Sequence, residues 1–352
     1  MEEAEIVQGL IKEIKKCTLP LAFMEVCGTH TMTISRYGLR NMLPANIRLL
    51  SGPGCPVCVT ATREIDTGIA FARIPGLILT TFGDMLRVPG SHSSLLRERA
   101  GGSDVRVVYS ILEALQIAKE NPNRPVVFYS VGFETTAPSA AFGIMEAKKA
   151  KLQNFSVLCI HKTLPNALRA LLGSGELGLN GFILPGHVSA IIGADVYDFL
   201  AEEYGISGVV AGFEPRDVLG AILMLIRRQG SAARIENEYS RVVKAKGNPA
   251  ALAAMQQVFE PCDSEWRGLG VRPGSGLRIN ARWQDFDALR RFAVEPGESV
   301  EHKACACGDI LRGVKLPAEC ALFGALCTPE NPVGPCMVSS EGSCAAYYRY
   351  RE

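Results

Sequence analysis

Short apolar runs alternate with helix-patterned stretches from about residue 20 to residue 226. Each run is followed by a turn containing glycine or proline, and then by a stretch with apolar residues three and four positions apart. Apolar runs without polar alternation are typical of parallel strands that are covered on both faces. The pattern therefore predicts an α/β fold with parallel sheets between layers of helices. The predicted strands are LAFMEV, IRLL, GLILTTF, VRVVYS, PVVFYSV, FSVLCI, GFILP and GVVAGF.

The chain of 352 residues is long enough for more than one domain, because a single core stops growing near ~250–300 residues. A turn signal at 121–123 divides the α/β pattern into two units, 20–118 and 122–230, which are expected to face one another across a cleft. Beyond them, 231–352 is predicted to form a mostly helical and irregular domain, with helices in IENEYSRVVKAK and PAALAAMQQVFE. Residues 1–19 have the pattern of a helix that could pack on any of the three.

The charge and hydropathy of the chain exclude several classes of partner. Thirty-seven basic and thirty-six acidic residues give a formal charge of +1, without the long basic run that favours nucleic acid. No stretch reaches the ~18 apolar residues of a membrane-spanning helix, and the N-terminal segment does not resemble a secretion signal. We therefore expect a cytoplasmic protein with no nucleic-acid or membrane partner. In that reducing compartment, cysteines are expected to hold metal or to perform redox chemistry.

Chemically reactive residues follow directly after the predicted strands. Because open α/β sheets bind their ligands at the carboxyl edge, these residues are expected to line a common cleft. The segments are CGTHT at 27–31, GPGCPVC at 52–58, GFETT at 132–136, HKT at 161–163, PGHVS at 185–189 and GFEP at 212–215.

The cysteines of two of these segments allow different chemistries. Cys55 and Cys58 form a C-x-x-C pair beside a predicted helix start, which favours thiolate and predicts a redox dithiol; half of a structural zinc site is the alternative. Cys27 and His30 share one loop, and thiolate with imidazole suits iron or zinc. Alternatively, His30 activates Cys27 as a nucleophile, or Cys27 is a small buried apolar residue.

Three further side chains are candidates for the cleft: Glu134, Glu214 and His187. Each could equally cap a helix or satisfy a hydrogen bond at a helix start. Thr135 and Thr136 are candidate caps of a helix that begins near Ala137. His92 and His161 receive no assignment, and Cys17, Cys159 and Cys262 are expected to be inert thiols.

Six of the twelve cysteines lie close together near the C-terminus, with the spacing C-x-C-x12-C-x6-C-x8-C-x7-C. Paired hooks of a zinc site and the regular run of a bacterial ferredoxin are both missing, which leaves a cubane iron–sulfur cluster as the favoured interpretation. Such a cluster uses four sulfurs, so two remain for a disulfide beside it. The six are Cys305, Cys307, Cys320, Cys327, Cys336 and Cys344.

The motifs CGTHT, GPGCPVC, GFETTAP and PGHVS, followed by this tail, resemble the HypD family of hydrogenase maturation factors. The resemblance extends from about residue 20 to the C-terminus. It implies a scaffold on which the Fe(CN)2CO group of [NiFe]-hydrogenase is assembled together with HypC, while HypE supplies cyanide. It further implies that iron is held transiently by Cys27 and a cysteine of HypC, with His30 nearby, and that Cys55 and Cys58 are redox-active.

The tail also resembles the cluster site of ferredoxin-dependent thioredoxin reductase. That resemblance implies electron flow from an unidentified donor through the cluster and its adjacent disulfide to the C-x-x-C dithiol. Glu134, Glu214 and His187 could supply protons or hold the carrier's tail. An iron–sulfur protein-disulfide reductase is the alternative function. The implied ligands of a [4Fe-4S] cluster are Cys305, Cys320, Cys327 and Cys344, and the implied disulfide joins Cys307 and Cys336.

Overall fold

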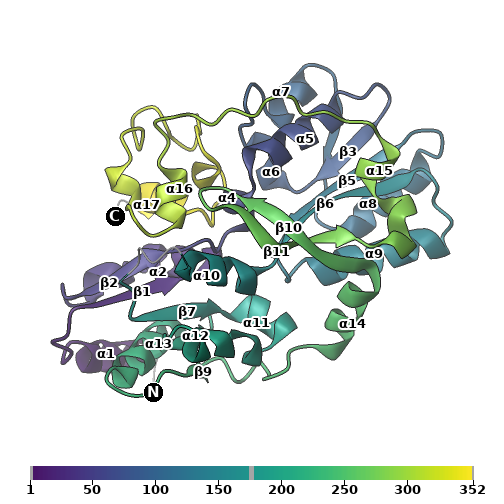
Figure 1. Cartoon of the computed structure of the whole chain (residues 1–352). Helices are drawn as coiled ribbons and strands as arrows, with labels where there is room; N and C mark the ends of the chain where they lie inside the picture. The colour runs from purple at the N-terminus through teal and green to yellow at the C-terminus, as the bar shows by residue number, and fades with distance from the viewer. Residues whose placement is uncertain (1–2, 174–177, 351–352) are drawn as a thin grey trace.

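The computed structural model describes residues 3–173 and 178–350. Within these ranges the strands form two sheets flanked by helices, so the predicted α/β class is confirmed (Figure 1). The first sheet is entirely parallel and has the order β2-β1-β7-β8-β9. Its strands are β1 (Leu21–Glu25), β2 (Ile47–Ser51), β7 (Gly181–Pro185), β8 (Gly208–Ala211) and β9 (Ile235–Asn237).

The second sheet has the order β10-β11-β6-β5-β3-β4. Four strands are parallel, and a hairpin of β10 and β11 is added antiparallel to β6. The strands are β3 (Ile78–Thr81), β4 (Asp104–Val107), β5 (Val126–Gly132), β6 (Phe155–Lys162), β10 (Phe259–Trp266) and β11 (Gly270–Ile279).

The longer helices cover the faces of the sheets, and shorter ones form the turns at their carboxyl edges (Figure 1). The α-helices are α1 (Glu3–Ile14), α2 (Gly28–Arg36), α3 (Leu39–Met42), α4 (Pro56–Val59), α5 (Thr62–Ala72), α6 (Gly83–Arg87), α7 (Leu95–Ala100), α8 (Ile111–Glu120), α9 (Ala137–Lys149), α10 (Leu164–Leu172), α11 (Gly186–Ile192), α12 (Asp198–Glu202), α13 (Pro215–Arg228), α14 (Pro249–Val258), α15 (Ala288–Arg291), α16 (Cys307–Leu311) and α17 (Ser343–Tyr350). The 3-10 helices are η1 (Asp195–Tyr197), η2 (Ala281–Phe286), η3 (Pro317–Glu319) and η4 (Pro335–Met337).

Both expected α/β units, 20–118 and 122–230, contribute strands to both sheets. The chain leaves the first sheet after β2, builds the four parallel strands of the second, and returns to the first with β7. The turn at 121–123 is present, but it joins α8 to β5 inside the second sheet.

The segment 231–352 also enters both sheets. IENEYSRVVKAK does not form the expected helix, because its first residues pair with β8 as strand β9 and turns follow. PAALAAMQQVFE contains α14, as predicted, and the Gly/Pro-rich passage at 268–276 contributes to β11. The segment from about residue 295 onward consists of short helices and turns, as expected for the cysteine-rich tail.

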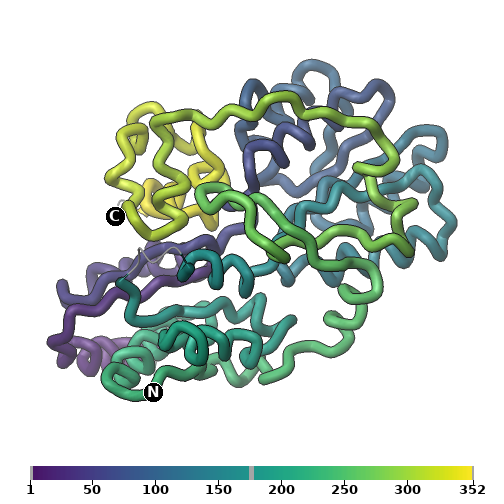
Figure 2. The backbone as a smooth tube through the Cα atoms, in the orientation of Figure 1, coloured from purple at the N-terminus to yellow at the C-terminus, as the bar shows by residue number. Residues whose placement is uncertain are grey.

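The tail shares an apolar core with the first sheet. Met24 and Leu50 on this sheet belong to the same buried cluster as Ile310, Leu311 and Met337 of the tail. Figure 2 shows the yellow C-terminal tube against the purple N-terminal strands and the dark blue segment that follows them. On the other side of the first sheet, α1 packs on α13, so the N-terminal helix belongs to this half of the molecule.

Candidate functional site

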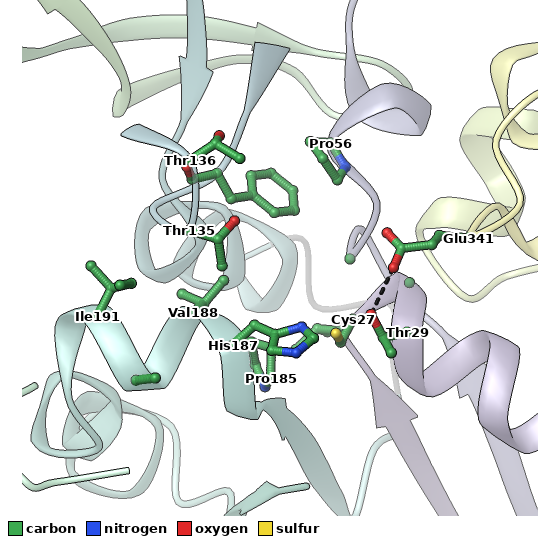
Figure 3. Close-up of a pocket in the computed structure, with 15 residues that line it drawn as sticks. Cys27, Thr29, Pro56, Thr135, Thr136, Pro185, His187, Val188, Ile191 and Glu341 are labelled. Atoms are coloured by element: carbon green, nitrogen blue, oxygen red, sulfur yellow. Dashed lines mark hydrogen bonds between the residues drawn. The ribbon is translucent and has the colours of Figure 1, made fainter. Parts of the chain in front are cut away.

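A cavity of about 400 Å³ lies where the carboxyl ends of β1, β5 and β7 meet. Its wall combines residues of CGTHT, GPGCPVC, GFETT and PGHVS, so the structure brings together four of the six segments from the sequence (Figure 3). Apolar side chains supply most of the lining. The residues around the cavity include Cys27, Thr29, Phe133, Thr135, Thr136, His187, Val188, Ile191 and Glu341.

Cys27 lies between β1 and α2, and its side chain is buried. Its N–H donates to Glu25 Oε2 at 3.0 Å, while Thr31 Oγ1 donates to Glu25 Oε1 at 2.6 Å. Burial raises the pKa of the Cys27 thiol to about 12 and that of the Glu25 carboxyl to about 7. A neutral thiol at this position would lose its proton on binding a metal ion. Sequence reasoning missed Glu25, although an acidic residue inside the apolar run LAFMEV was a usable signal.

The loop of Cys27 packs directly on the loop that carries Cys55. Gly28 N–H donates to Gly54 O at 3.0 Å, and a Cβ at Gly54 would lie 2.1 Å from Cys27 N. Only glycine fits such a close approach of two backbones. The dithiol segment is therefore held beside the Cys27 cavity.

His187, and not His30, is the imidazole that lines the described cavity wall. The His30 ring is fully buried, where Nε2 donates to Gly212 O at 2.8 Å and Nδ1 has no partner within the described residues. Burial lowers the pKa of His30 to about 4. The His187 ring stacks on Phe213 with 3.8 Å between centroids, and Figure 3 shows it directed toward Cys27 from the opposite wall.

Glu341 brings the cysteine-rich tail into the cavity wall. Thr29 Oγ1 donates to Glu341 Oε1 at 2.6 Å (Figure 3), and a Cβ at Gly28 would lie 2.5 Å from Glu341 Cβ. The contact joins residues 312 positions apart, so no local pattern could reveal it.

Glu134 and Glu214 both lie at helix starts. Leu164 N–H at the start of α10 donates to Glu134 Oε1 at 2.9 Å, whereas Oε2 is buried without a partner in the described part of the chain. Burial raises the pKa of Glu134 to about 7. Glu214 caps α13 and pairs with Arg216 at 3.0 Å on the surface. Helix α9 begins at Ala137 with Thr136 at its N-cap position, although the Thr136 side chain makes no capping bond.

The HKT segment lies away from the cavity. His161 is buried in β6, with Nδ1 3.4 Å from Cys159 Sγ, and burial lowers its pKa to about 4. The neighbouring Lys162 is also buried, and its Nζ donates to Glu64 Oε1 and Ser264 Oγ, each at 2.8 Å. Lys162 is therefore hydrogen-bonded between α5 and the second sheet, whereas His161 Nε2 is buried without a partner in the described part of the chain.

The dithiol cysteines are in contact with the tail cysteines. Cys55 is the N-cap of α4, where Cys58 N–H donates to Cys55 Sγ at 3.3 Å. The Cys58 thiol is a neighbour of the Cys336 thiol, since α4 packs on η4, and burial raises the pKa of Cys58 well above its usual range. Cys336 is in turn a neighbour of Cys307 in the wall of the tail cavity. A continuous row of free thiols thus runs through Cys55, Cys58, Cys336, Cys307 and Cys305.

All six tail cysteines line one small apolar cavity. Cys305 and Cys320 are partly exposed, whereas the other four are buried. Soft sulfur donors around an apolar space suit an iron–sulfur cluster, so the donor chemistry fits the group that the sequence predicts. Among residues 3–173 and 178–350, no set of three or more His, Cys, Asp or Glu side chains is already gathered at metal-binding geometry.

Comparison with known proteins gives the family. A sequence model of the HypD family, described as "Hydrogenase formation hypA family", matches residues 4–351. The chain belongs to the HypD family. The hydrogenase maturation factor HypD of Azotobacter vinelandii is 52% identical over 93% of this chain and 88% of its own length. The HypD of Cupriavidus necator is 50% identical (99% and 95%), and that of Escherichia coli K12 is 47% identical (95% and 90%).

The resemblance carried by the sequence motifs is therefore confirmed, and this HypD family member acts in hydrogenase maturation. No helix in the described part of the chain has the length and apolar character needed to cross a membrane.

The buried carboxyl of Glu134 predicts a pH-dependent stability. Its pKa is raised from 4.5 to about 7, so its contribution to stability is fully present below pH 4.5 and is lost as the pH rises through 7. Glu134→Gln keeps an acceptor for Leu164 N–H without the charge. We expect this variant to gain up to about 3 kcal/mol in free energy of unfolding over the parent protein at alkaline pH, and little at acidic pH.

Urea unfolding of both proteins on the two sides of this pH window would measure the effect. Glu134→Ala is the matched control, because it also removes the acceptor and should be less stable than Glu134→Gln at both pH values by about 1–3 kcal/mol. If the difference in free energy of unfolding between Glu134→Gln and the parent protein did not change with pH, the raised pKa of Glu134 would be contradicted.

Proposed function

We propose that this HypD protein holds iron transiently at Cys27 while the Fe(CN)2CO group of [NiFe]-hydrogenase is assembled, and that its other cysteines supply electrons for ligand attachment. HypC would provide a second thiolate to the iron, and HypE would bring cyanide. The observation that carries the proposal is the contact between Cys58 and Cys336, which joins the dithiol segment to the tail beside the Cys27 cavity.

The chemistry of thiol exchange explains why this contact matters. Reduction of a Cys307–Cys336 disulfide takes two electrons and two protons. The Cys336 thiolate can then attack Cys58 of a Cys55–Cys58 disulfide, which releases the Cys55 thiolate and forms a Cys336–Cys58 mixed disulfide. The Cys307 thiolate attacks Cys336 in this mixed disulfide, so the Cys307–Cys336 disulfide re-forms and Cys55 and Cys58 are left reduced. The contact between Cys58 and Cys336 supports this exchange.

In the tail, Cys305, Cys320, Cys327 and Cys344 would hold the [4Fe-4S] cluster. When bound, the cluster supplies electrons one at a time from an external donor. Two such transfers reduce one disulfide. The Cys307 and Cys336 thiols, which are buried neighbours in the tail cavity, are suited to serve as that disulfide pair.

The two electrons provided by Cys55 and Cys58 would be used in the cavity beside Cys27. Release of cyanide from a carrier thiocyanate takes two electrons and leaves cyanide and a thiolate, and oxidation of Cys55 and Cys58 to a disulfide provides two. Phe133, Val188 and Ile191 offer an apolar wall for the carrier's chain. His187 and Glu341 are the titratable groups placed to move protons beside Cys27. Glu134, which faces α10, is better suited to position the GFETT turn.

Infrared spectroscopy of protein purified together with HypC tests the proposal. Under hydrogenase-forming conditions the parent complex should show cyanide and carbonyl bands, and Cys27→Ala should lose them while keeping the iron of the tail. Cys17→Ala is the matched control, since Cys17 packs on the core shared by α1 and α13, does not line the cavity and should leave the bands unchanged. A parent complex without bands would exclude the scaffold function.

The row of thiols also favours the alternative, an iron–sulfur protein-disulfide reductase. Such an enzyme would use the tail and the C-x-x-C pair but would not need Cys27. Equal rates of disulfide reduction by the parent protein and Cys27→Ala, without infrared bands in either, would favour this function.

A further inference from the structure

A buried arginine lies between the dithiol segment and the tail. Arg267 follows β10 and is only 7% exposed. Its N–H donates to Val59 O at 2.9 Å, its Nε to Thr60 O at 3.2 Å, and its NH2 group to Thr62 Oγ1 at 2.7 Å. All three acceptors follow Cys58 directly in the chain. The arginine therefore fixes the segment that leads out of α4.

The same arginine is joined to the tail. Its NH1 group pairs with Glu301 Oε1 at 3.1 Å, a few residues before Cys305. The next residue, Gly268, packs on Gly308, where an added Cβ would lie 2.3 Å from Gly308 Cα. Arg267 and Gly268 thus contact the chain on both sides of the first tail cysteines.

The charge of Arg267 is only partly neutralised. Its ion-pair partner Glu301 is 53% exposed, so water screens that carboxylate, whereas the guanidinium lies in the interior. Charges interact more strongly across a protein interior than across water. Arg267 and Val333 line one cavity, and Val333 N–H donates to Cys327 Sγ at 3.3 Å, so the arginine is close to the tail cysteines.

We propose that Arg267 is a positioning residue for electron transfer, which fixes the dithiol segment against the tail and favours, through its charge, the reduction of the cluster held there. This inference rests on the proposed iron–sulfur function. Gain of one electron makes the cluster more negative by one charge, and a nearby cation stabilises that state. Sequence reasoning had no signal for Arg267, because its partners in the dithiol segment, Thr60 and Thr62, are more than 200 residues away along the chain.

The test is a redox titration of the full-length protein, purified without oxygen, with dithionite as the reductant and electron paramagnetic resonance as the readout. Arg267→Gln should lower the equilibrium constant for cluster reduction about ten-fold, equivalent to a midpoint about 59 mV more negative for one electron. Arg267→Lys keeps the charge and should shift the midpoint much less. Arg291→Gln is the matched control. Arg291 donates to Phe155 O at the first residue of β6, whereas β10, which precedes Arg267, is contacted by Lys162 at the last residue of β6, so this variant should leave the midpoint unchanged.

Each outcome decides the proposal. Equal midpoints in the parent, Arg267→Gln and Arg267→Lys, even with a reduced melting temperature, would show a structural role only and overturn it. If Arg267→Gln does not fold, Glu301→Gln takes its place, since it removes the partner carboxylate and should shift the midpoint to more positive values; no shift would overturn the proposal. A parent protein without a cluster would exclude the proposed function and this inference with it.

Discussion

Replacement of Cys336 by alanine is expected to abolish hydrogenase maturation while the protein keeps its iron. Cys336 is a neighbour of Cys58 of the dithiol segment and of Cys307 of the tail. Its removal interrupts the row of thiols at the point where exchange must pass from one segment to the other. Electrons that reach the tail could then no longer reduce a Cys55–Cys58 disulfide.

Hydrogenase activity in a bacterium that depends on this chain for HypD function would measure the effect, with iron content determined on the purified protein. Thiol labelling should find Cys55 and Cys58 oxidised in the variant. Cys159→Ala is the matched control, since Cys159 is a half-buried thiol in β6 outside the row, and it should support maturation. Full maturation by Cys336→Ala would exclude the proposed route, whereas loss of iron would make Cys336 a ligand.

Replacement of Cys327 by alanine is expected to remove the cluster. Cys327 is buried in the tail cavity, where Val333 N–H donates to its sulfur at 3.3 Å, a hydrogen bond that would stabilise the thiolate form of a cluster ligand. With one of four ligands lost, iron content should fall from about four atoms per chain to near zero, together with the visible absorbance of the cluster.

Cys307→Ala is the control for this experiment, because Cys307 lines the same cavity but is assigned to the disulfide. This variant should keep its iron and absorbance and lose the ability to support maturation. Loss of the cluster in Cys307→Ala, with retention in Cys327→Ala, would reverse the division of the six cysteines.

Local pattern predicted strands β1 to β8 of this fold but not how they pair, and it missed β9 and the hairpin of β10 and β11. LAFMEV and PVVFYSV became β1 and β5, since apolar side chains on both faces of a short run fit a covered parallel strand. The same pattern contains no information on which strands are neighbours, so the return of the chain to the first sheet with β7 was not foreseen. Residues 235–237 read as helix and form β9, because pairing with β8 overrides their weak helical preference.

The candidate site also contains some residues that the sequence could indicate and others that only the structure reveals. Cys27, Thr135 and His187 could be selected because they directly follow strands, and the carboxyl edges of neighbouring strands meet. Glu341 and Arg267 act through contacts between segments far apart in the sequence, which only the folded chain reveals. The sequence placed His30 in one loop with Cys27, but His30 lies on α2, and its side chain packs against Gly212 and Phe213 instead of lining the cavity.

The apolar core that the tail shares with the first sheet limits how this protein can change. Met24 and Leu50 would be exposed to water if the cysteine-rich segment were removed or exchanged for another. We therefore expect that the cysteine-rich segment does not fold when it is transferred alone into a different protein. The reduction potential of the proposed cluster can instead change through single substitutions that preserve the packing between the tail and the first sheet.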